Sequence, residues 1–374
     1  MSMSTLKDYP WAQAPIIVNA PMSGIATSAL AAAVTRAGGL GLIGFLDNPH
    51  ILDIQLQRAR LLLNDNDKAK TGSPSKTAGL DPSATATENG ITDILPIGVG
   101  VIVLGMSVSS FLPLVAKHRP AIVWLSFAEK ATHFKSWTEG IRAMSPRSKI
   151  WIQVGSVSAA LETARACHPD VLVLQGSDAG GHGHARSSSV ITLIPEVADA
   201  LAEDGFEGDR RIPLVAAGGI MDGRGVAAAM TLGASGVVMG TRFLAAHETD
   251  IPEEYRREIL SASDGGESTV RSRVFDEMWF PSAWPGMYDG RCLRNKCYDE
   301  WEKGVPIEEI RARLYVTASR AQTGDEGFRD ASSLWAGAGV GLVKRVEKAG
   351  DIVETVREDA RRRLLDTYLA HYSL

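Results

Sequence analysis

The sequence predicts an α/β protein built as a (β/α)8 TIM barrel with a helical, aromatic-rich C-terminal extension. Short apolar runs with the composition of buried strands alternate with helix-like segments, which implies parallel strands, because each crossover needs a helix-sized connection. Eight such units favour a closed barrel over an open, doubly wound sheet. A group of tryptophans that follows the eighth run predicts the extension.

The predicted elements follow one another along the first 250 residues, which we expect to form the barrel core. The strands are expected at residues 16–19, 40–44, 97–103, 122–126, 150–154, 171–175, 212–216 and 236–239. The helix-like stretches between them include residues 28–37, 51–63, 156–167, 191–203 and 222–232.

Three segments depart from this alternation. Residues 64–92 are polar and glycine-containing, so we expect a surface insertion there. Residues 251–345 are expected to pack as a substrate-side extension or cap at the barrel mouth, because they are rich in aromatic residues. Residues 346–374 are expected to form a closing helix packed on the barrel. The tryptophans of the extension are Trp279, Trp284, Trp301 and Trp335.

Composition narrows the classes of function. The net charge of −5 argues against a nucleic-acid partner, and no apolar run is long enough to span a membrane. Cys292 and Cys297 are five residues apart, but no further Cys or His lies near enough to complete a metal site, so we expect none. A cytoplasmic location is expected. A peroxisomal one stays open, because residues 371–374 resemble that address only loosely, with Ser373 at the basic position.

The most informative segment is residues 171–184, in which an apolar run ends in a glycine-rich stretch that carries His182 and His184. Glycines permit sharp turns and close approach of the backbone to a ligand. A histidine at the carboxyl end of a buried parallel strand is placed where α/β enzymes carry out chemistry. The segment therefore predicts an active site. Asp178, within it, is expected to orient a histidine or, preferably, to cap the following turn.

Two later strands also end in glycines, at Gly218-Gly219 and at Gly240-Thr241. Loops after the seventh and eighth strands of such barrels often bind phosphate through backbone N–H groups. The alternative is that these glycines only close turns. Arg242 is expected either to neutralise a phosphate or to form a surface ion pair, and Asp222 is expected to cap the next helix.

Other strand ends suggest the rest of the ligand. The small residues and thioether of Ala20-Pro21-Met22 suit a flat ring, and Gln153 and Gln175 each offer an amide that donates and accepts. This set suits a planar heterocycle such as a flavin. The alternative for the two amides is a core position in which neighbouring backbone groups satisfy them.

These motifs jointly resemble the nitronate monooxygenase family, formerly called 2-nitropropane dioxygenases. The matching pieces are residues 19–22, 153–155, 175–183, 217–220 and 240–243. The resemblance implies an FMN-dependent barrel that holds the phosphate on the two later glycine loops and places His182 beside the flavin. The cofactor-binding residues it implies are Ala20, Pro21, Met22, Gln153, Gln175, Gly180, Gly181, Gly218, Gly219, Gly240 and Thr241.

The implied reaction is oxidation of an alkyl nitronate with O2 to a carbonyl compound and nitrite. His182 would orient the anion or, as a base, remove the α-proton of a neutral nitroalkane. His184 is the less favoured candidate, because it is expected to point differently in an extended loop. The substrate is left open, since residues 291–295, where the family has a substrate-side segment, are not diagnostic.

Two rival functions remain open at this stage. One is an NAD(P)H-dependent flavin reductase of enoyl thioesters or quinones on the same fold. The other is a flavin-free barrel that senses a phosphorylated metabolite, which the paired histidines disfavour. The expected partners are a small-molecule substrate and O2, and a homodimer is left open as the assembly.

Overall fold

Eight parallel strands form the central sheet of this computed structural model, which describes residues 7–45, 47–69, 94–320 and 327–372. Along the sheet the strands are neighbours in the order β1-β9-β8-β6-β5-β4-β3-β2. Their bounds are β1 (Ile16–Asn19), β2 (Leu42–Gly44), β3 (Leu95–Ile102), β4 (Pro120–Ser126), β5 (Lys149–Val154), β6 (Val171–Gln175), β8 (Leu214–Ala217) and β9 (Gly236–Met239).

A single buried side chain helps to close this sheet between its two outer strands, β1 and β2. Val18 and Leu40 form an isolated parallel bridge. The amide of fully buried Asn19 donates to the carbonyl oxygen of Leu42 at 2.8 Å and accepts from its N–H at 2.9 Å. The Asn19 side chain thus takes the place of a main-chain partner between the short strands β1 and β2. The prediction of a TIM barrel is confirmed.

Helices cover the outer face of the barrel, and their apolar faces pack on the outward-facing strand residues in the largest core cluster. A second cluster fills the inside of the barrel around Trp124 and Trp151, where the Trp151 indole donates to the Tyr9 hydroxyl at 2.9 Å. The covering helices are α2 (Ser28–Arg36), α3 (Pro49–Ala69), α4 (Val108–His118), α5 (His133–Met144), α6 (Val157–Cys167), α7 (Val190–Glu203) and α8 (Gly223–Thr231).

The helix α3 is longer than the predicted 51–63. It begins at Pro49 and continues to Ala69, so the first residues of the predicted surface insertion are helical. Residues 70–92 of that insertion lie outside the described residues.

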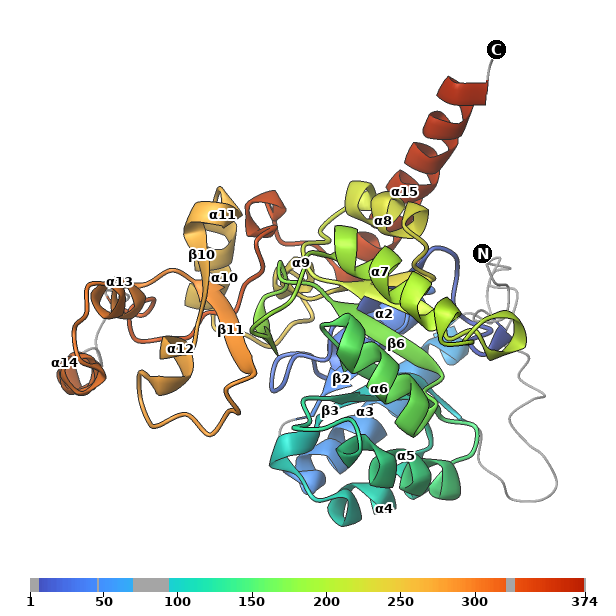
Figure 1. The fold of residues 1–374 in the computed structure, drawn as a ribbon, viewed down its shortest axis with the longest axis horizontal. Coiled ribbons are helices and arrows are strands. Elements are labelled where there is room, and N and C mark those ends of the chain that lie inside the picture. Colours follow the sequence, from blue (N-terminus) through green and yellow to red (C-terminus); the bar gives the residue numbers. More distant parts are fainter. Residues whose placement is uncertain (1–6, 46, 70–93, 321–326, 373–374) are drawn as a thin grey trace.

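The chain beyond β9 forms a second group of elements beside the barrel mouth (Figure 1). Its centre is a three-stranded antiparallel sheet in the order β10-β11-β7, in which β7 (Gly181–His184) comes from the glycine-rich segment after β6. The elements are α9 (Thr241–Leu244), α10 (Glu253–Ser261), α11 (Gly265–Ser268), β10 (Thr269–Ser272), α12 (Val274–Glu277), β11 (Tyr288–Leu293), α13 (Lys296–Glu302) and α14 (Ile307–Arg320).

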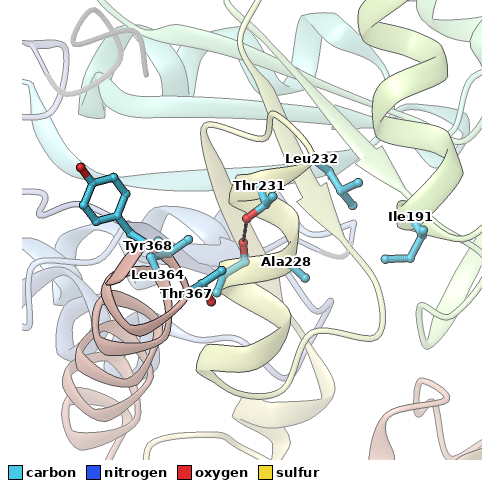
Figure 2. A pocket seen from close by; sticks show the side chains of 8 residues that line it. Ile191, Ala228, Thr231, Leu232, Leu364, Thr367 and Tyr368 are labelled. Atoms are coloured by element: carbon cyan, nitrogen blue, oxygen red, sulfur yellow. Dashed lines mark hydrogen bonds between the residues drawn. The ribbon is translucent and has the colours of Figure 1, made fainter. Parts of the chain in front are cut away.

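The last helix, α15 (Ala349–Tyr372), packs against α8 and α2, and its final turns extend away from the barrel (Figure 1). Its Arg357 is buried and donates to the carbonyl oxygens of Ala37 and Gly38, which anchors the helix to the end of α2. Figure 2 shows a shallow, mostly apolar groove that α15 forms with α7 and α8, lined among others by Ile191, Leu232 and Tyr368. None of the described helices is both long and apolar enough to cross a membrane.

Candidate functional site

A cavity of about 410 Å³ lies at the carboxyl ends of the barrel strands, between the barrel and the extension. His182 and every cofactor-binding residue predicted from the sequence line it. This convergence is a property of the fold, because the strand ends are far apart in sequence and meet only when the barrel closes. The predicted residues on its wall are Ala20, Pro21, Met22, Gln153, Gln175, Gly180, Gly181, His182, Gly218, Gly219, Gly240 and Thr241.

Glycine is structurally required at several of these positions. Gly218 and Gly219 have φ angles of +113° and +73°, a region that side chains strongly disfavour. A Cβ at Gly180 would lie 2.5 Å from the backbone of Ala336 and Gly337, so only glycine admits that segment. The glycines therefore shape the cavity wall and leave main-chain groups open toward it.

Residues 336–338 are a part of the site that the sequence did not reveal. The Gly337 N–H donates to the Thr241 hydroxyl at 2.9 Å, and the Ala338 N–H donates to the Asp178 carbonyl oxygen at 2.9 Å. Since the Thr241 oxygen accepts from the backbone, its own proton remains available for a ligand in the cavity.

The two glutamines of the cavity wall form a short hydrogen-bonded chain. Gln153 donates to the Gln175 side-chain oxygen at 2.9 Å, and Gln175 donates to the His182 carbonyl oxygen at 2.9 Å. Each amide thereby fixes the orientation of the next while keeping one N–H group unused in these bonds. Neighbouring groups thus satisfy part of each amide, and both residues line the cavity, so a hydrogen bond from either amide to a flavin stays a prediction.

The His182 imidazole is held on several sides. Its Nε2 lies 2.7 Å from Oδ1 of Asp276, and its ring stacks on Trp284 with centroids 3.9 Å apart and an interplanar angle of 14°. Trp335 contacts it at 4.6 Å, and the edge-on ring of Phe127 lies at 6.4 Å. The histidine is therefore oriented before any substrate arrives.

The sequence did not single out Asp276 or assign a contact to any tryptophan of the extension. Asp276 is 94 residues from His182 and reaches it from the short helix α12. Trp284 and Trp335 line the cavity together with Tyr255, whose hydroxyl donates to the Trp335 carbonyl oxygen at 2.8 Å. The available signal was the concentration of aromatic residues in the extension.

The structure separates the two histidines for a reason other than the expected one. Both lie on the regular strand β7, where residues two apart share a face, so a difference in direction was the wrong reason. They differ in position along the strand, since His182 pairs with Gly290 and His184 with Tyr288.

His184 lies outside the cavity wall, packed against Gly155 and edge-on to Tyr288 at 5.2 Å. Burial, and secondarily the Arg271 guanidinium, lowers the pKa of His184 below its usual value. Its neutral form is therefore the favoured one in the folded protein.

Other predicted residues fall outside the cavity wall. Asp222 caps α8 as predicted, accepting from Arg224 N–H at 2.9 Å. Arg242 pairs with Glu347, and both side chains are largely buried, so the ion pair forms but is not a surface one. Arg291 donates to the carbonyl oxygen of Ser177 at 3.1 Å. The carboxylate of Asp178 lies against Gly219, and its role as a cap or an orienting group stays a prediction.

The electrostatics of the wall are unusual for a phosphate site. Among the described residues that line it, none is Lys or Arg. Trp124 lines the cavity with part of its side chain, and its indole N–H is buried without a hydrogen-bond partner within the described chain. No cluster of three or more His, Cys, Asp or Glu residues in the described ranges is arranged to hold a metal ion.

Comparison with known proteins identifies the family of the chain. The model of the nitronate monooxygenase family matches residues 102–359. The chain is 40% identical to nitronate monooxygenase npaC of Metarhizium robertsii, over 98% of this chain and 96% of that one. It is 37% identical to a nitronate monooxygenase of Neurospora crassa, over 95% of this chain and 92% of that one.

Solved structures with the same fold are more distant in sequence. FabK from Thermotoga maritima aligns with a TM-score of 0.68 and 24% identity over 97% of this chain and 98% of its own. A nitroalkane oxidase from Streptomyces ansochromogenes aligns with a TM-score of 0.68 and 22% identity, over 97% and 99% of the two chains. These two likenesses support the fold. The family match and the full-length relatives go further: the chain belongs to the nitronate monooxygenase family, whose members are oxidoreductases.

Proposed function

We propose that this protein uses FMN and O2 to oxidise alkyl nitronates, and nitroalkanes after removal of their α-proton, to carbonyl compounds and nitrite. The observation that carries the proposal is the convergence of glycines, amides and one oriented histidine on a single cavity at the barrel mouth. Such a cavity, with few polar groups at defined places, is typical of a cofactor site.

The residues of the barrel wall fit a flavin. The loops at Gly218-Gly219 and Gly240-Thr241 offer main-chain N–H groups and the free Thr241 proton to a phosphate, which compensates for the absence of cations among the described wall residues. Gln153 and Gln175 offer hydrogen bonds to the edge of a ring system. The flavin, when bound, supplies the electron transfer and the reaction with oxygen.

His182 is proposed to act on the substrate. An imidazolium would attract a nitronate anion, and a neutral imidazole would accept the α-proton of a nitroalkane. The aromatic rings of Trp284 and Trp335 restrict the ring of His182 and exclude water from its faces. A restrained base in a desolvated setting needs little reorganisation during proton transfer.

The test is an anaerobic flavin-reduction screen on the purified protein loaded with FMN. We expect ethyl nitronate to bleach the flavin absorbance, and NADH and NADPH to leave it unchanged over the same time. Rapid bleaching by either nicotinamide nucleotide, with none by the nitronate, would replace the proposal with the reductase function. Failure of the apoprotein to take up FMN would overturn both.

A further inference from the structure

The structure assigns Asp276 as the positioning residue that fixes the tautomer and the orientation of His182. This inference rests on the proposed function, in which His182 is the base. It adds a carboxylate–imidazole pair whose members come from the barrel segment β7 and from the extension helix α12.

The pair has the geometry of a strong hydrogen bond. Asp276 Oδ1 lies 2.7 Å from His182 Nε2, within the range of charge-assisted N–H···O bonds. A carboxylate only accepts, so Nε2 carries the hydrogen. The lone pair of the neutral ring is then on Nδ1, which makes Nδ1 the nitrogen that takes a proton from the substrate.

Asp276 is a buried carboxylate whose hydrogen bonding is incomplete. Its side chain is only 7% exposed, and its second oxygen, Oδ2, is buried without a hydrogen-bond partner in the described part of the chain. Burying a carboxylate with incomplete pairing is unfavourable. The turn that carries it is nevertheless fixed by buried Val274 and Phe275, so the carboxylate is held against His182.

Two other titratable groups near the pair, Tyr288 and Cys292, stay neutral near pH 7. Burial raises the pKa of Tyr288, on β11, to about 12. Burial and the charge of Asp276 raise the pKa of the Cys292 thiol, also on β11, well above its usual value. Arg271 and Asp289 pair with each other beside His184. Asp276 is thus the charged group that contacts the His182 ring.

Removal of the α-proton by His182 needs no further acid or base. The C–H bond at the α-carbon of a nitroalkane breaks, its electron pair moves into the nitro group to form the nitronate, and the proton binds Nδ1. The new imidazolium keeps its Nε2–H bond to Asp276, whose negative charge stabilises it. This arrangement parallels the carboxylate that orients a catalytic histidine in serine hydrolases.

The test compares Asp276→Asn, Asp276→Ala and the matched control Glu277→Gln, a neighbour on α12 that pairs with Arg273 and not with His182. With nitroethane, we expect kcat/KM to fall about 10- to 100-fold for Asp276→Asn and further for Asp276→Ala, as part of the roughly 10²–10⁴-fold that a general base contributes. With pre-formed ethyl nitronate, which needs no proton removal, we expect a change within about threefold. Glu277→Gln should match the wild type with both substrates.

A further readout separates positioning from a general structural defect. Nitrogen NMR of ¹⁵N-histidine protein, with the His182 signals identified from His182→Asn, should show hydrogen on Nε2 in the wild type and a tautomer mixture in Asp276→Ala. Hydrogen on Nδ1 in the wild type, or an unchanged tautomer in Asp276→Ala, would overturn the assignment.

The two proposals fail in different ways. A wild-type protein that acts on neither nitroethane nor ethyl nitronate would refute the proposed function, whereas the NMR measurement would still test the pairing. A wild-type protein that acts on both, with Asp276→Asn equally active on nitroethane, would refute the pairing alone. If Asp276→Ala fails to fold, the Asp276→Asn comparison still decides.

Discussion

The two sides of the cavity are built from opposite kinds of residues. The barrel side presents glycines, small residues and amides from strand ends, such as Gly218, Gly240, Gln153 and Gln175. The extension side presents the aromatic rings of Tyr255, Trp284 and Trp335. The barrel side offers backbone and amide hydrogen bonds suited to a cofactor, and the extension side offers apolar surface that surrounds His182. We therefore expect substitutions on the barrel side to change flavin binding and those on the extension side to change turnover.

The largest effect is expected at His182, where the two sides meet. His182→Asn should retain flavin and lower kcat/KM for nitroethane about 10²- to 10⁴-fold, because the base is lost. Steady-state oxygen consumption measures this. His184→Asn is the matched control, since His184 lies outside the cavity wall, and it should stay within a few-fold of the wild type. Equal losses in the two variants would mean that the distinction between the histidines is wrong.

The next largest effect is expected on the barrel side of the cavity, at Gly180. Gly180→Ala should destabilise the protein by about 1–3 kcal/mol through overpacking, because a Cβ would lie 2.5 Å from backbone atoms of residues 336 and 337. Thermal unfolding and flavin retention on gel filtration measure the result. Gly286→Ala is the control, with no atom within 4 Å of its Cβ. A stable, flavin-bound Gly180→Ala protein would contradict the tight packing of this segment.

A smaller effect is expected on the extension side. Trp284→Leu removes the ring stacked on His182 at 3.9 Å. An aromatic pair contributes about 0.5–1.5 kcal/mol, so kcat/KM for nitroethane should fall about 2- to 12-fold while flavin affinity is unchanged. Trp301→Leu, an exposed tryptophan of the same extension, should leave both quantities unchanged. Loss of flavin from Trp284→Leu would contradict the assignment of flavin binding to the barrel side and of turnover to the extension side.

The pH dependence of stability tests the burial of His184. Burial lowers the pKa of His184 below its ordinary value of 6.5, so the unfolded chain binds the proton more readily than the folded one. Its contribution to stability is therefore present above pH 6.5 and is lost as the pH falls through the folded-state pKa. His184→Gln should show a shallower decline of the urea midpoint over this range than the wild type. Parallel declines would indicate that His184 is not buried as described.

The smallest effect is expected at Arg242. Because Arg242 pairs with Glu347, Arg242→Gln should leave the Kd for FMN within about twofold, whereas loss of a charged phosphate contact would cost about 1.5–3 kcal/mol. Thr241→Val, which removes a hydroxyl on the cavity wall, should weaken FMN binding about 2- to 12-fold. Fluorescence titration of the apoproteins measures both. A larger loss of FMN affinity in Arg242→Gln than in Thr241→Val would indicate that Arg242 contacts the phosphate.

The barrel side was predictable because its signals are local. A buried strand followed by glycines can be recognised in one segment, and the barrel then brings the strand ends together whatever their spacing, which places Gly218, Gly240 and Gln175 on one wall. The resemblance of the same motifs to the nitronate monooxygenase family reinforced that prediction. The strand bounds differed from the predicted ones by a few residues, as at β8, which begins at Leu214 and not at Ile212.

The extension side depended on tertiary structure because its contacts are long-range. The sequence indicated aromatic packing but not that Trp284 stacks on His182, and nothing near Asp276 distinguishes it from a surface carboxylate. His182 and Asp276 are 94 residues apart in sequence. The antiparallel pairing of β7 with β11 brings the segments that carry them together. The sequence by itself determined the barrel, the residues of the cavity wall and the candidate histidine, since each follows from local pattern. Only the tertiary structure decided which groups surround that histidine, because strand register and the packing of the extension set those contacts.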